Sequence, residues 1–372
     1  MKKILALVNI LIITSLLFAQ EDVHKFEILH KVKTTPVKSQ GKSGTCWAFA
    51  ATSVIETELL RLGKGEIDIS EMFTVRHKLL PMAENYIRYH GNSNFGDGGQ
   101  AHDLINAINN YGMVPEKIYS GKNIGLDVHN QSEMTSVLNG MLEAILKKKS
   151  GKLTPKWKEA VEAVLNTYLG TPPQKFEYEG KEYTPKSFVQ ELDLDTKKYV
   201  EITSYSDVPY YEKFNLPLPD NWTNEEYYNI PIDELIEIIN YSLENGFSIC
   251  WDGDSGKDNF YRDEGYAVIP LKEKSKDDTI TEPEDEKVIT QKMRQETFEN
   301  FDVTDDHLMH IVGIAKNQNG TKFYYTKNSW GTNNKKYDGF WYMSENYVRL
   351  KTVAIMVNVD SIPKKIRDKL GV

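Results

Sequence analysis

Cysteine is scarce in this sequence, with only Cys46 and Cys250 among 372 residues. If Cys46 is a free nucleophile, no structural disulfide can remain, and the fold must be stable without one. The composition allows this, because 40% of the residues are hydrophobic and a chain of this length can bury a large core. The length is typical of about two domains.

Metal-binding motifs are missing as well. The sequence contains neither His-Glu-x-x-His nor Cys-x-x-Cys, the spacings typical of zinc sites. His307 and His310 are three residues apart in an expected strand, so their side chains would point to opposite faces. We therefore expect no catalytic metal and no other cofactor.

Basic clusters of the kind that bind nucleic acid are not found either. The formal net charge is −9, and we expect an acidic soluble protein with no nucleic-acid partner.

The N-terminus carries an apolar run from Ile4 to Ala19, preceded by Lys2 and Lys3. A charged start, a short apolar core and a small residue at the cleavage point predict a secretory signal peptide over residues 1–19. The run is too short for a comfortable membrane span, although an uncleaved anchor is the alternative. We expect an exported (periplasmic or secreted) protein with no membrane association after cleavage. Removal of Lys2 and Lys3 would change the formal charge from −9 to −11.

Apolar residues at helical spacing predict a core helix over 47–62. A second helix is predicted over 72–80, ended by Pro81. The other expected elements are helices over 101–110, 134–149, 156–169 and 232–245 and a strand over 246–252.

A loop rich in Pro and Gly, residues 35–45, delivers Cys46 to the start of the first core helix. Unpaired N–H groups and the partial positive charge at a helix N-terminus favour the thiolate, the reactive form of cysteine. Gln40 lies six residues upstream, and Gly41 and Gly44 allow the loop to fold tightly. The Gln40 amide and the Cys46 backbone N–H could then stabilise an oxyanion together.

A second cluster lies near the C-terminal end of the chain. Residues 305–314 have strand character, residues 317–320 (Asn-Gln-Asn-Gly) predict a hairpin turn, and residues 323–331 form the return strand. A histidine on one strand and Asn328 on its partner suit nucleophilic catalysis. The asparagine can orient the imidazole while the other ring nitrogen faces the sulfur.

These two segments resemble the papain-like cysteine peptidases, whose nucleophile loop reads Pro-Val-Lys-x-Gln and then Gly-x-Cys-Trp-Ala-Phe. The Asn-Ser-Trp-Gly run at 328–331 matches the family residue for residue. In the family the base follows Asp or Thr and precedes a Gly by six positions. That selects His307 and leaves His310 as a packed or surface histidine. Trp330 would shield the Asn–His bond from water. Ser43 departs from the pattern, because the family has a cysteine there.

The resemblance also implies substrate-binding residues. Gly98 and Gly99 end a glycine-rich turn, and paired glycines there let a peptide lie against the backbone as an added strand. An ordinary loop is the alternative. Leu308 follows the base, at a position that borders the second substrate pocket in the family. We expect an apolar, moderately restricted pocket.

The segment from about residue 119 to 231 has no counterpart in papain itself. About 26 residues separate Ala19 from Cys46, which leaves no room for a long pro-segment. Both features point to the bleomycin hydrolase and aminopeptidase C branch. That branch has a comparable strand with a buried Cys-Asp pair, so we interpret Cys250 as structural. In members of that branch, the C-terminal carboxylate of the chain lies in the cleft and meets the free amine of the substrate. The residues after Pro363 are a candidate arm of this kind, although a disordered tail is equally open.

The predicted architecture is therefore an α+β, papain-like two-domain fold with a central insertion. The expected divisions are a signal peptide (1–19), an N-terminal strand and helical domain with the nucleophile (20–118), an insertion, helical then loop-rich (119–231), a β-rich domain with His and Asn (232–360) and a C-terminal arm (361–372).

The expected activity is that of an exported cysteine peptidase acting on peptides or proteins through a thioester acyl-enzyme. An aminopeptidase is favoured and an endopeptidase is the alternative. A catalytically silent peptide-binding protein and a nonproteolytic acyl transferase are further possibilities. A thiolate–imidazolium pair is expected before substrate arrives. The oligomeric state stays open, a homo-oligomer included.

Overall fold

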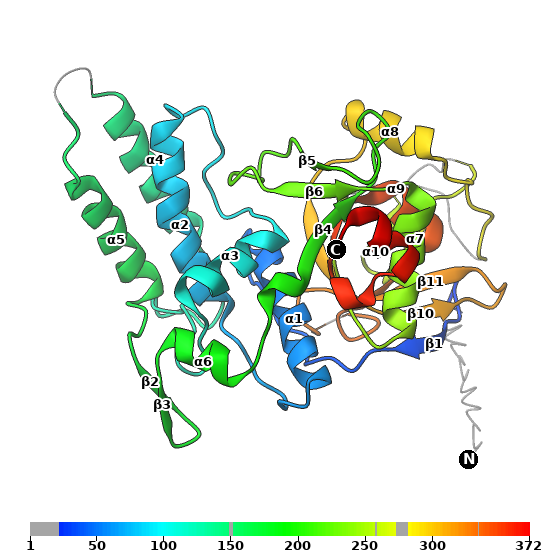
Figure 1. Ribbon diagram of the computed structural model, residues 1–372, viewed down its shortest axis with the longest axis horizontal. Coiled ribbons are helices and arrows are strands. Elements are labelled where there is room, and N and C mark those ends of the chain that lie inside the picture. The colour runs from blue at the N-terminus through cyan, green and yellow to red at the C-terminus, as the bar shows by residue number, and fades with distance from the viewer. Residues whose placement is uncertain (1–21, 149–151, 257–258, 273–281, 334) are drawn as a thin grey trace, which may run out of the picture.

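The computed structural model describes residues 22–148, 152–256, 259–272, 282–333 and 335–372. A helical part and a part built on one large sheet lie side by side (Figure 1). The predicted signal peptide lies outside the described residues. Among the described residues, none of the helices combines the length and the apolar character of a membrane span. The helical part contains α1 (Cys46–Arg61), α2 (Glu71–Arg88), α3 (Ala101–Tyr111), α4 (Ser132–Leu146), α5 (Lys156–Leu169) and α6 (Pro185–Glu191).

Helix α1 is the element that positions the predicted nucleophile. It begins at Cys46, and every residue from Trp47 to Leu59 is buried. The helix contacts α2 and α3 on one side and strands of the sheet on the other. Its core cluster includes Cys250 and Leu308 from the sheet, so one continuous apolar core joins the two parts. Cys250 is 1% exposed, as expected for a structural cysteine.

Helix α2 differs from the sequence prediction, which ended it at Pro81. The helix continues to Arg88 with Pro81 inside it. Proline removes one helical hydrogen bond, but Met82 and Ala83 beyond it are fully buried in the helical core. Helices α4 and α5 also pack on α2. Tertiary packing therefore outweighs the local cost of the proline.

Within the described residues, the large sheet has eleven strands in the order β5-β6-β4-β13-β7-β10-β11-β12-β9-β8, and β1 pairs with β10. The β10–β11 pair is the predicted hairpin, antiparallel and closed by the turn at 317–320. The strand bounds are β1 (Glu27–Lys31), β4 (Tyr199–Thr203), β5 (Lys213–Asn215), β6 (Glu226–Asn229), β7 (Ile249–Gly253), β8 (Phe260–Tyr261), β9 (Tyr266–Ala267), β10 (His307–Lys316), β11 (Lys322–Lys327), β12 (Phe340–Ser344) and β13 (Thr352–Asn358).

The segment 119–231 contributes to both parts of the molecule. Its helices α4 and α5 cover α2, as Figure 1 shows at the left. A small hairpin of β2 (Phe176–Tyr178) and β3 (Lys181–Tyr183) follows. Strands β4, β5 and β6 then join the large sheet beside β13. The loop-rich half of the predicted insertion is thus part of the sheet, and the chain between β5 and β6 returns toward the helical part.

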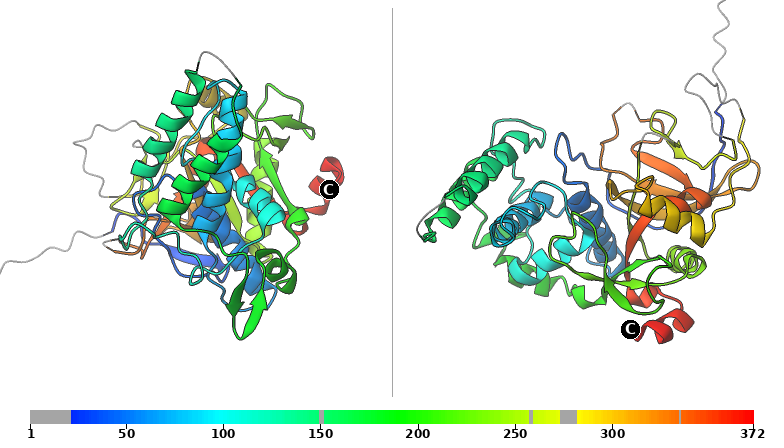
Figure 2. Two further views of the ribbon diagram at one scale, coloured as in Figure 1. Left: turned by 90° about the vertical axis from the view of Figure 1, so that its left-hand side faces the viewer. Right: turned by 90° about the horizontal axis from the view of Figure 1, so that it is seen from above.

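The C-terminal segment, for which the sequence left open an arm in the cleft or a disordered tail, is a helix, α10 (Lys364–Leu370). Ile366 and Leu370 are buried in the core cluster that contains α7 (Ile232–Glu244). Lys369 pairs with Glu234 at 2.6 Å, and Lys365 pairs with Glu237. Figure 2 shows α10 on the outside of the molecule. The sheet part is completed by α8 (Gln291–Glu299) and α9 (Glu345–Lys351).

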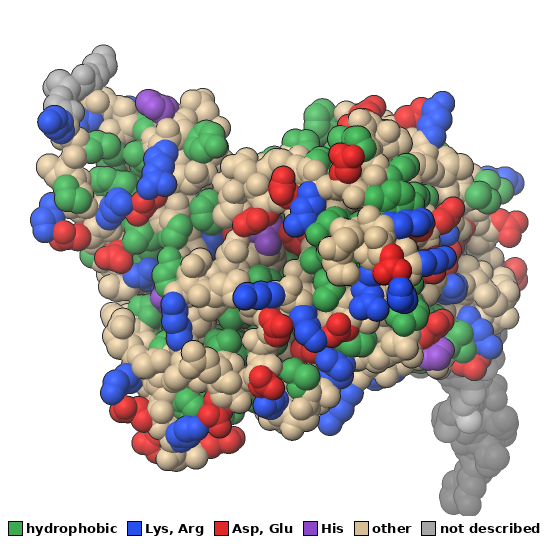
Figure 3. Space-filling view, in the orientation of Figure 1, with side chains coloured by type: hydrophobic (Ala, Val, Ile, Leu, Met, Phe, Trp, Pro, Cys, Tyr) green, Lys and Arg blue, Asp and Glu red, His purple; other side chains and the backbone are tan. Residues whose placement is uncertain are grey.

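The surface in Figure 3 carries lysine and arginine side chains interspersed with aspartate and glutamate. A notch opens at the top of this view, between the helical part and the sheet part.

Candidate active site

The loop before Cys46 is fastened to the segment that follows β11. The Gln40 backbone N–H donates to the Ser329 carbonyl at 2.8 Å, and the Gly331 N–H donates to the Lys38 carbonyl at 3.1 Å. The Lys38 ammonium pairs with three acids of the helical part at 2.5 to 2.8 Å, which anchors the loop from the other side. These acids are Glu56, Asp68 and Glu71.

Gly41 is required in this loop for two reasons. Its φ is +63°, and a Cβ there would overlap the His129 carbonyl. The adjoining Lys42 N–H donates to the same carbonyl at 2.8 Å. A glycine therefore permits the tight turn that the sequence predicts.

Gln40 is buried between the loop and Ser329. Its Oε1 accepts from the Ser329 hydroxyl at 2.6 Å, and its Nε2 donates to the Ser43 carbonyl at 2.7 Å. An amide nitrogen has two protons, so one N–H remains for an oxyanion. Ser43, where the family has cysteine, donates to the Gln40 carbonyl and bonds the Thr45 hydroxyl. Hydrogen bonds thus shape this turn.

His307 begins β10 and is paired with Asn328, just after β11. The His307 Nε2 lies 2.8 Å from the Asn328 Oδ1. Because an amide oxygen can only accept, Nε2 carries the proton and Nδ1 is the free, basic nitrogen. The Trp330 ring stacks on the imidazole with a centroid separation of 4.9 Å. The expected histidine, asparagine and tryptophan are therefore brought together.

His310 has a different environment. Its Nδ1 lies 2.8 Å from the Ser53 hydroxyl of α1, and its side chain is 1% exposed. It is a packed histidine, one of the two alternatives left by the sequence.

The Cys46 sulfur lies within hydrogen-bonding reach of the backbone N–H of Leu308, the residue directly after His307. The start of α1 and the start of β10 therefore meet at this point. Burial raises the pKa of the Cys46 thiol to about 12, and the charges of Asp305 and Asp252 add to this. The N–H groups of Leu308 and Trp47 act in the opposite direction.

Burial also lowers the pKa of His307, while the hydrogen bond that His307 donates to Asn328 and the charge of Asp306 act in the opposite direction. Each shift favours the neutral form of its own group. The thiolate–imidazolium pair expected before substrate arrives stays a prediction.

Gly98 and Gly99 are closely packed. A Cβ on Gly99 would overlap Asp103, Trp47 and Lys78, and a Cβ on Gly98 would overlap the Asp220 carboxylate. Other groups therefore do approach both glycines closely. At Gly98, however, the neighbouring group is a side chain of the inserted segment and not a substrate backbone. Their contact with a substrate backbone stays a prediction.

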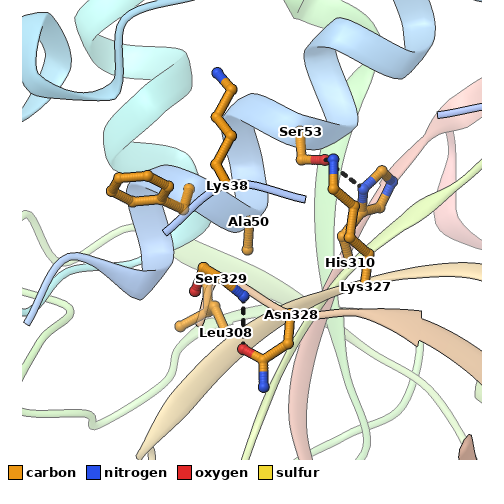
Figure 4. A pocket seen from close by; sticks show the side chains of 9 residues that line it. Lys38, Ala50, Ser53, Leu308, His310, Lys327, Asn328 and Ser329 are labelled. Carbon is orange, nitrogen blue, oxygen red and sulfur yellow. Dashed lines mark hydrogen bonds between the residues drawn. The ribbon is translucent and has the colours of Figure 1, made fainter. Parts of the chain in front are cut away.

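Leu308 is 2% exposed and faces α1. It lines a cavity of about 10 Å³ between α1 and the β10–β11 strands, with Ala50, Ser53 and His310 among the other walls (Figure 4). Such a space holds one water at most. The role of Leu308 beside a second substrate pocket stays a prediction.

Comparisons with known proteins bear on the family and the fold of this chain. Residues 10–371 match the model of the Peptidase C1-like family. Aminopeptidase C of Listeria monocytogenes is 26% identical over 267 residues, which cover 61% of this chain and 60% of that protein. Aminopeptidase G of Lactobacillus delbrueckii subsp. lactis is 22% identical over 390 residues, 92% of this chain and 85% of the relative. The match to the Listeria relative thus spans less than two thirds of its length.

The solved structure of PepW from Lactobacillus rhamnosis HN001 superposes with a TM-score of 0.73 at 19% identity, covering 93% of this chain and 84% of that one. The papain-like α+β fold is therefore confirmed.

Proposed function

We propose that this chain, which belongs to the Peptidase C1-like family, is a cysteine peptidase that removes residues from the N-terminus of peptides. The observation that carries the proposal is the meeting of Cys46, at the start of a helix, with the amide that follows His307, whose ring is bonded to Asn328. The relatives named aminopeptidase C and aminopeptidase G support the exopeptidase class.

The proposed reaction begins as the Cys46 sulfur attacks the scissile carbonyl carbon. The thiol proton passes to the His307 Nδ1 while the S–C bond forms and the carbonyl electron pair moves to oxygen. The free Gln40 N–H and the Cys46 backbone N–H stabilise this oxyanion. The intermediate collapses, the C–N bond breaks, and His307 returns its proton to the leaving amine.

The thioester is then hydrolysed. His307 takes a proton from water, and the resulting hydroxide adds to the thioester carbonyl. The C–S bond then breaks to release the acid, and His307 returns its proton to the Cys46 sulfur. Asn328 fixes the tautomer of His307 in both halves of the reaction. Trp330 covers the ring.

The test compares a peptide with a free N-terminus and its N-acetylated twin, with the products identified by mass spectrometry. The account expects loss of the first residue from the free peptide, at a rate abolished in Cys46→Ala. Internal cleavage of both peptides would identify an endopeptidase. Binding without cleavage would identify a peptide-binding protein, and transfer of the acyl group to added amines in preference to water an acyl transferase.

We also propose export, supported by the charged start and apolar run of residues 1–19. N-terminal sequencing of the protein from the culture fluid or periplasm should then find a chain that starts near Gln20. A chain that still starts at Met1 and stays in the cytoplasm would contradict export.

A further inference from the structure

A carboxylate of the inserted segment packs against Gly98, in the loop before α3. Asp220 belongs to the chain between β5 and β6, and its side chain occupies the space next to the Gly98 Cα. The Asn94 amide donates to Asp220, which holds the carboxylate in place. The inserted segment thus places an acid where the resemblance predicts substrate backbone.

Two further acids, which belong to the sheet part, lie close enough to Cys46 for their charges to act on it. Asp305 is two residues before His307, and its Oδ2 accepts from the Gln100 amide at 2.6 Å. Asp252 on β7 is opposite Leu308 of β10 in the strand register. Asp252 is 3% exposed. Within the described residues, the hydrogen-bonding neighbour of its carboxyl is the carboxyl of Asp305, an arrangement that requires a shared proton.

Two basic side chains, Lys78 and His102, lie near these acids. The Lys78 ammonium donates to the Gly98 carbonyl, lies 4.8 Å above the Trp47 ring and interacts with the charge of Asp220. The His102 Nδ1 lies 2.6 Å from the Glu201 carboxylate. Asp306 accepts from the Ser255 hydroxyl at 2.8 Å. Because Asp252 and Asp305 share one proton, this pair keeps one negative charge beside the nucleophile.

We propose that Asp220, Asp252 and Asp305 form a subsite that binds an ammonium or guanidinium group of the peptide substrate. This inference rests on the proposed peptidase function. The cation has two possible sources, the free N-terminal amine or a lysine or arginine side chain at the second position before the cleaved bond. In the described residues, no group of three or more histidine, cysteine, aspartate or glutamate side chains is arranged to hold a metal ion.

The subsite has a consequence for catalysis. The charges of Asp252 and Asp305 oppose thiolate formation at Cys46. A bound cation offsets these charges, so the substrate itself favours transfer of the thiol proton to His307. The cation then lowers KM through binding and raises kcat through activation of the sulfur.

The experiment measures kcat and KM on two matched pairs of fluorogenic amides. One pair is an alanine amide with a free or an acetylated amine. The other is an N-acetyl dipeptide amide in which the residue at the second position before the cleaved bond is lysine or norleucine. We expect wild type to prefer the cationic member of at least one pair by about tenfold or more, the usual effect of a hydrogen bond to a charged group. The pair that shows the preference identifies the source of the cation.

Asp220→Asn should reduce that preference at least several-fold, and Asp305→Asn should do the same. Glu212→Gln is the matched control, because Glu212 is an exposed acid of the same inserted segment and should leave the preference unchanged. If Asp305→Asn does not fold, as judged by its thermal unfolding, Asp220→Asn decides.

Cleavage by wild type without a cation preference, or an unchanged preference in Asp220→Asn, overturns the subsite and leaves the peptidase proposal intact. Absence of any cleavage by wild type overturns the peptidase proposal itself.

Discussion

The imidazole of His307 donates its Nε2 proton to the side-chain oxygen of Asn328 at 2.8 Å, across the hairpin of β10 and β11. This bond fixes which ring nitrogen is free to accept a proton. Replacement of Asn328 by alanine should lower kcat by about a hundredfold, since a misplaced catalytic group costs this much. The measurement is steady-state turnover of the free-amine substrate. Asn328→Asp keeps the acceptor and should retain more activity than Asn328→Ala; equal kcat for wild type and Asn328→Ala would remove Asn328 from the site.

Gln40 is predicted to supply one of two oxyanion donors. Gln40→Ala should lower kcat by about 10²–10³ with little change in KM, the usual cost of one such donor. Ser329→Ala is the control, because it removes the 2.6 Å bond that holds the Gln40 side chain but leaves the amide protons. A loss of less than about threefold in Gln40→Ala would exclude Gln40 from the oxyanion hole.

The pH dependence of Cys46 alkylation follows from the environment of its sulfur. Burial and the nearby carboxylates raise the thiol pKa to about 12, so the thiol is neutral below that pH and the thiolate fraction increases as pH rises. Iodoacetamide labelling in the absence of substrate should therefore be slow in mild acid and increase about tenfold per pH unit. Asp305→Asn should accelerate it. Fast labelling in mild acid that is lost in His307→Ala would instead indicate a preformed ion pair.

The C-terminal helix α10 should contribute to stability and not to the choice of cleavage site. Ile366 is fully buried against α7, so Ile366→Ala should lower the free energy of unfolding by about 2–5 kcal/mol. Chemical denaturation measures this loss. Lys364→Ala is the matched control, because Lys364 is exposed on the same helix, and its effect should be small.

Deletion of residues 364–372 provides the functional half of this test. The relative rates on the free and N-acetylated peptides should be unchanged at a temperature where the shortened chain is folded. A change from terminal trimming to internal cleavage would show that the C-terminus acts in the cleft after all.

Local sequence was sufficient for the parts of the fold that depend on nearby residues. The start of α1 follows from a glycine-rich loop next to an apolar helical pattern, and β10 with β11 follows from two strand-like runs around Asn-Gly. The choice of His307 over His310 as the catalytic base required the resemblance to the papain-like family, because both histidines lie on one strand. The structure then separates them by their partners, Asn328 and Ser53.

Long-range packing determined what the sequence did not show. Pro81 is accommodated inside α2 because the residues beyond it are buried by other helices. The sequence after Pro363 is rich in charged residues, which is typical of an exposed segment. It nevertheless forms a helix, because Ile366 and Leu370 are buried against α7. Asp220 reaches Gly98 across more than a hundred residues, and no local pattern predicts such a contact.

Detection of the acyl-enzyme tests most directly whether Cys46 is the nucleophile. Wild type is mixed with an activated ester of a free-amine amino acid, quenched in acid within one turnover, digested and analysed by mass spectrometry. The account predicts an acyl mass increase on the peptide that contains Cys46, removed by hydroxylamine as expected for a thioester and absent in Cys46→Ala. Turnover of the ester with no acyl group on Cys46, or with equal turnover by Cys46→Ala, would contradict it.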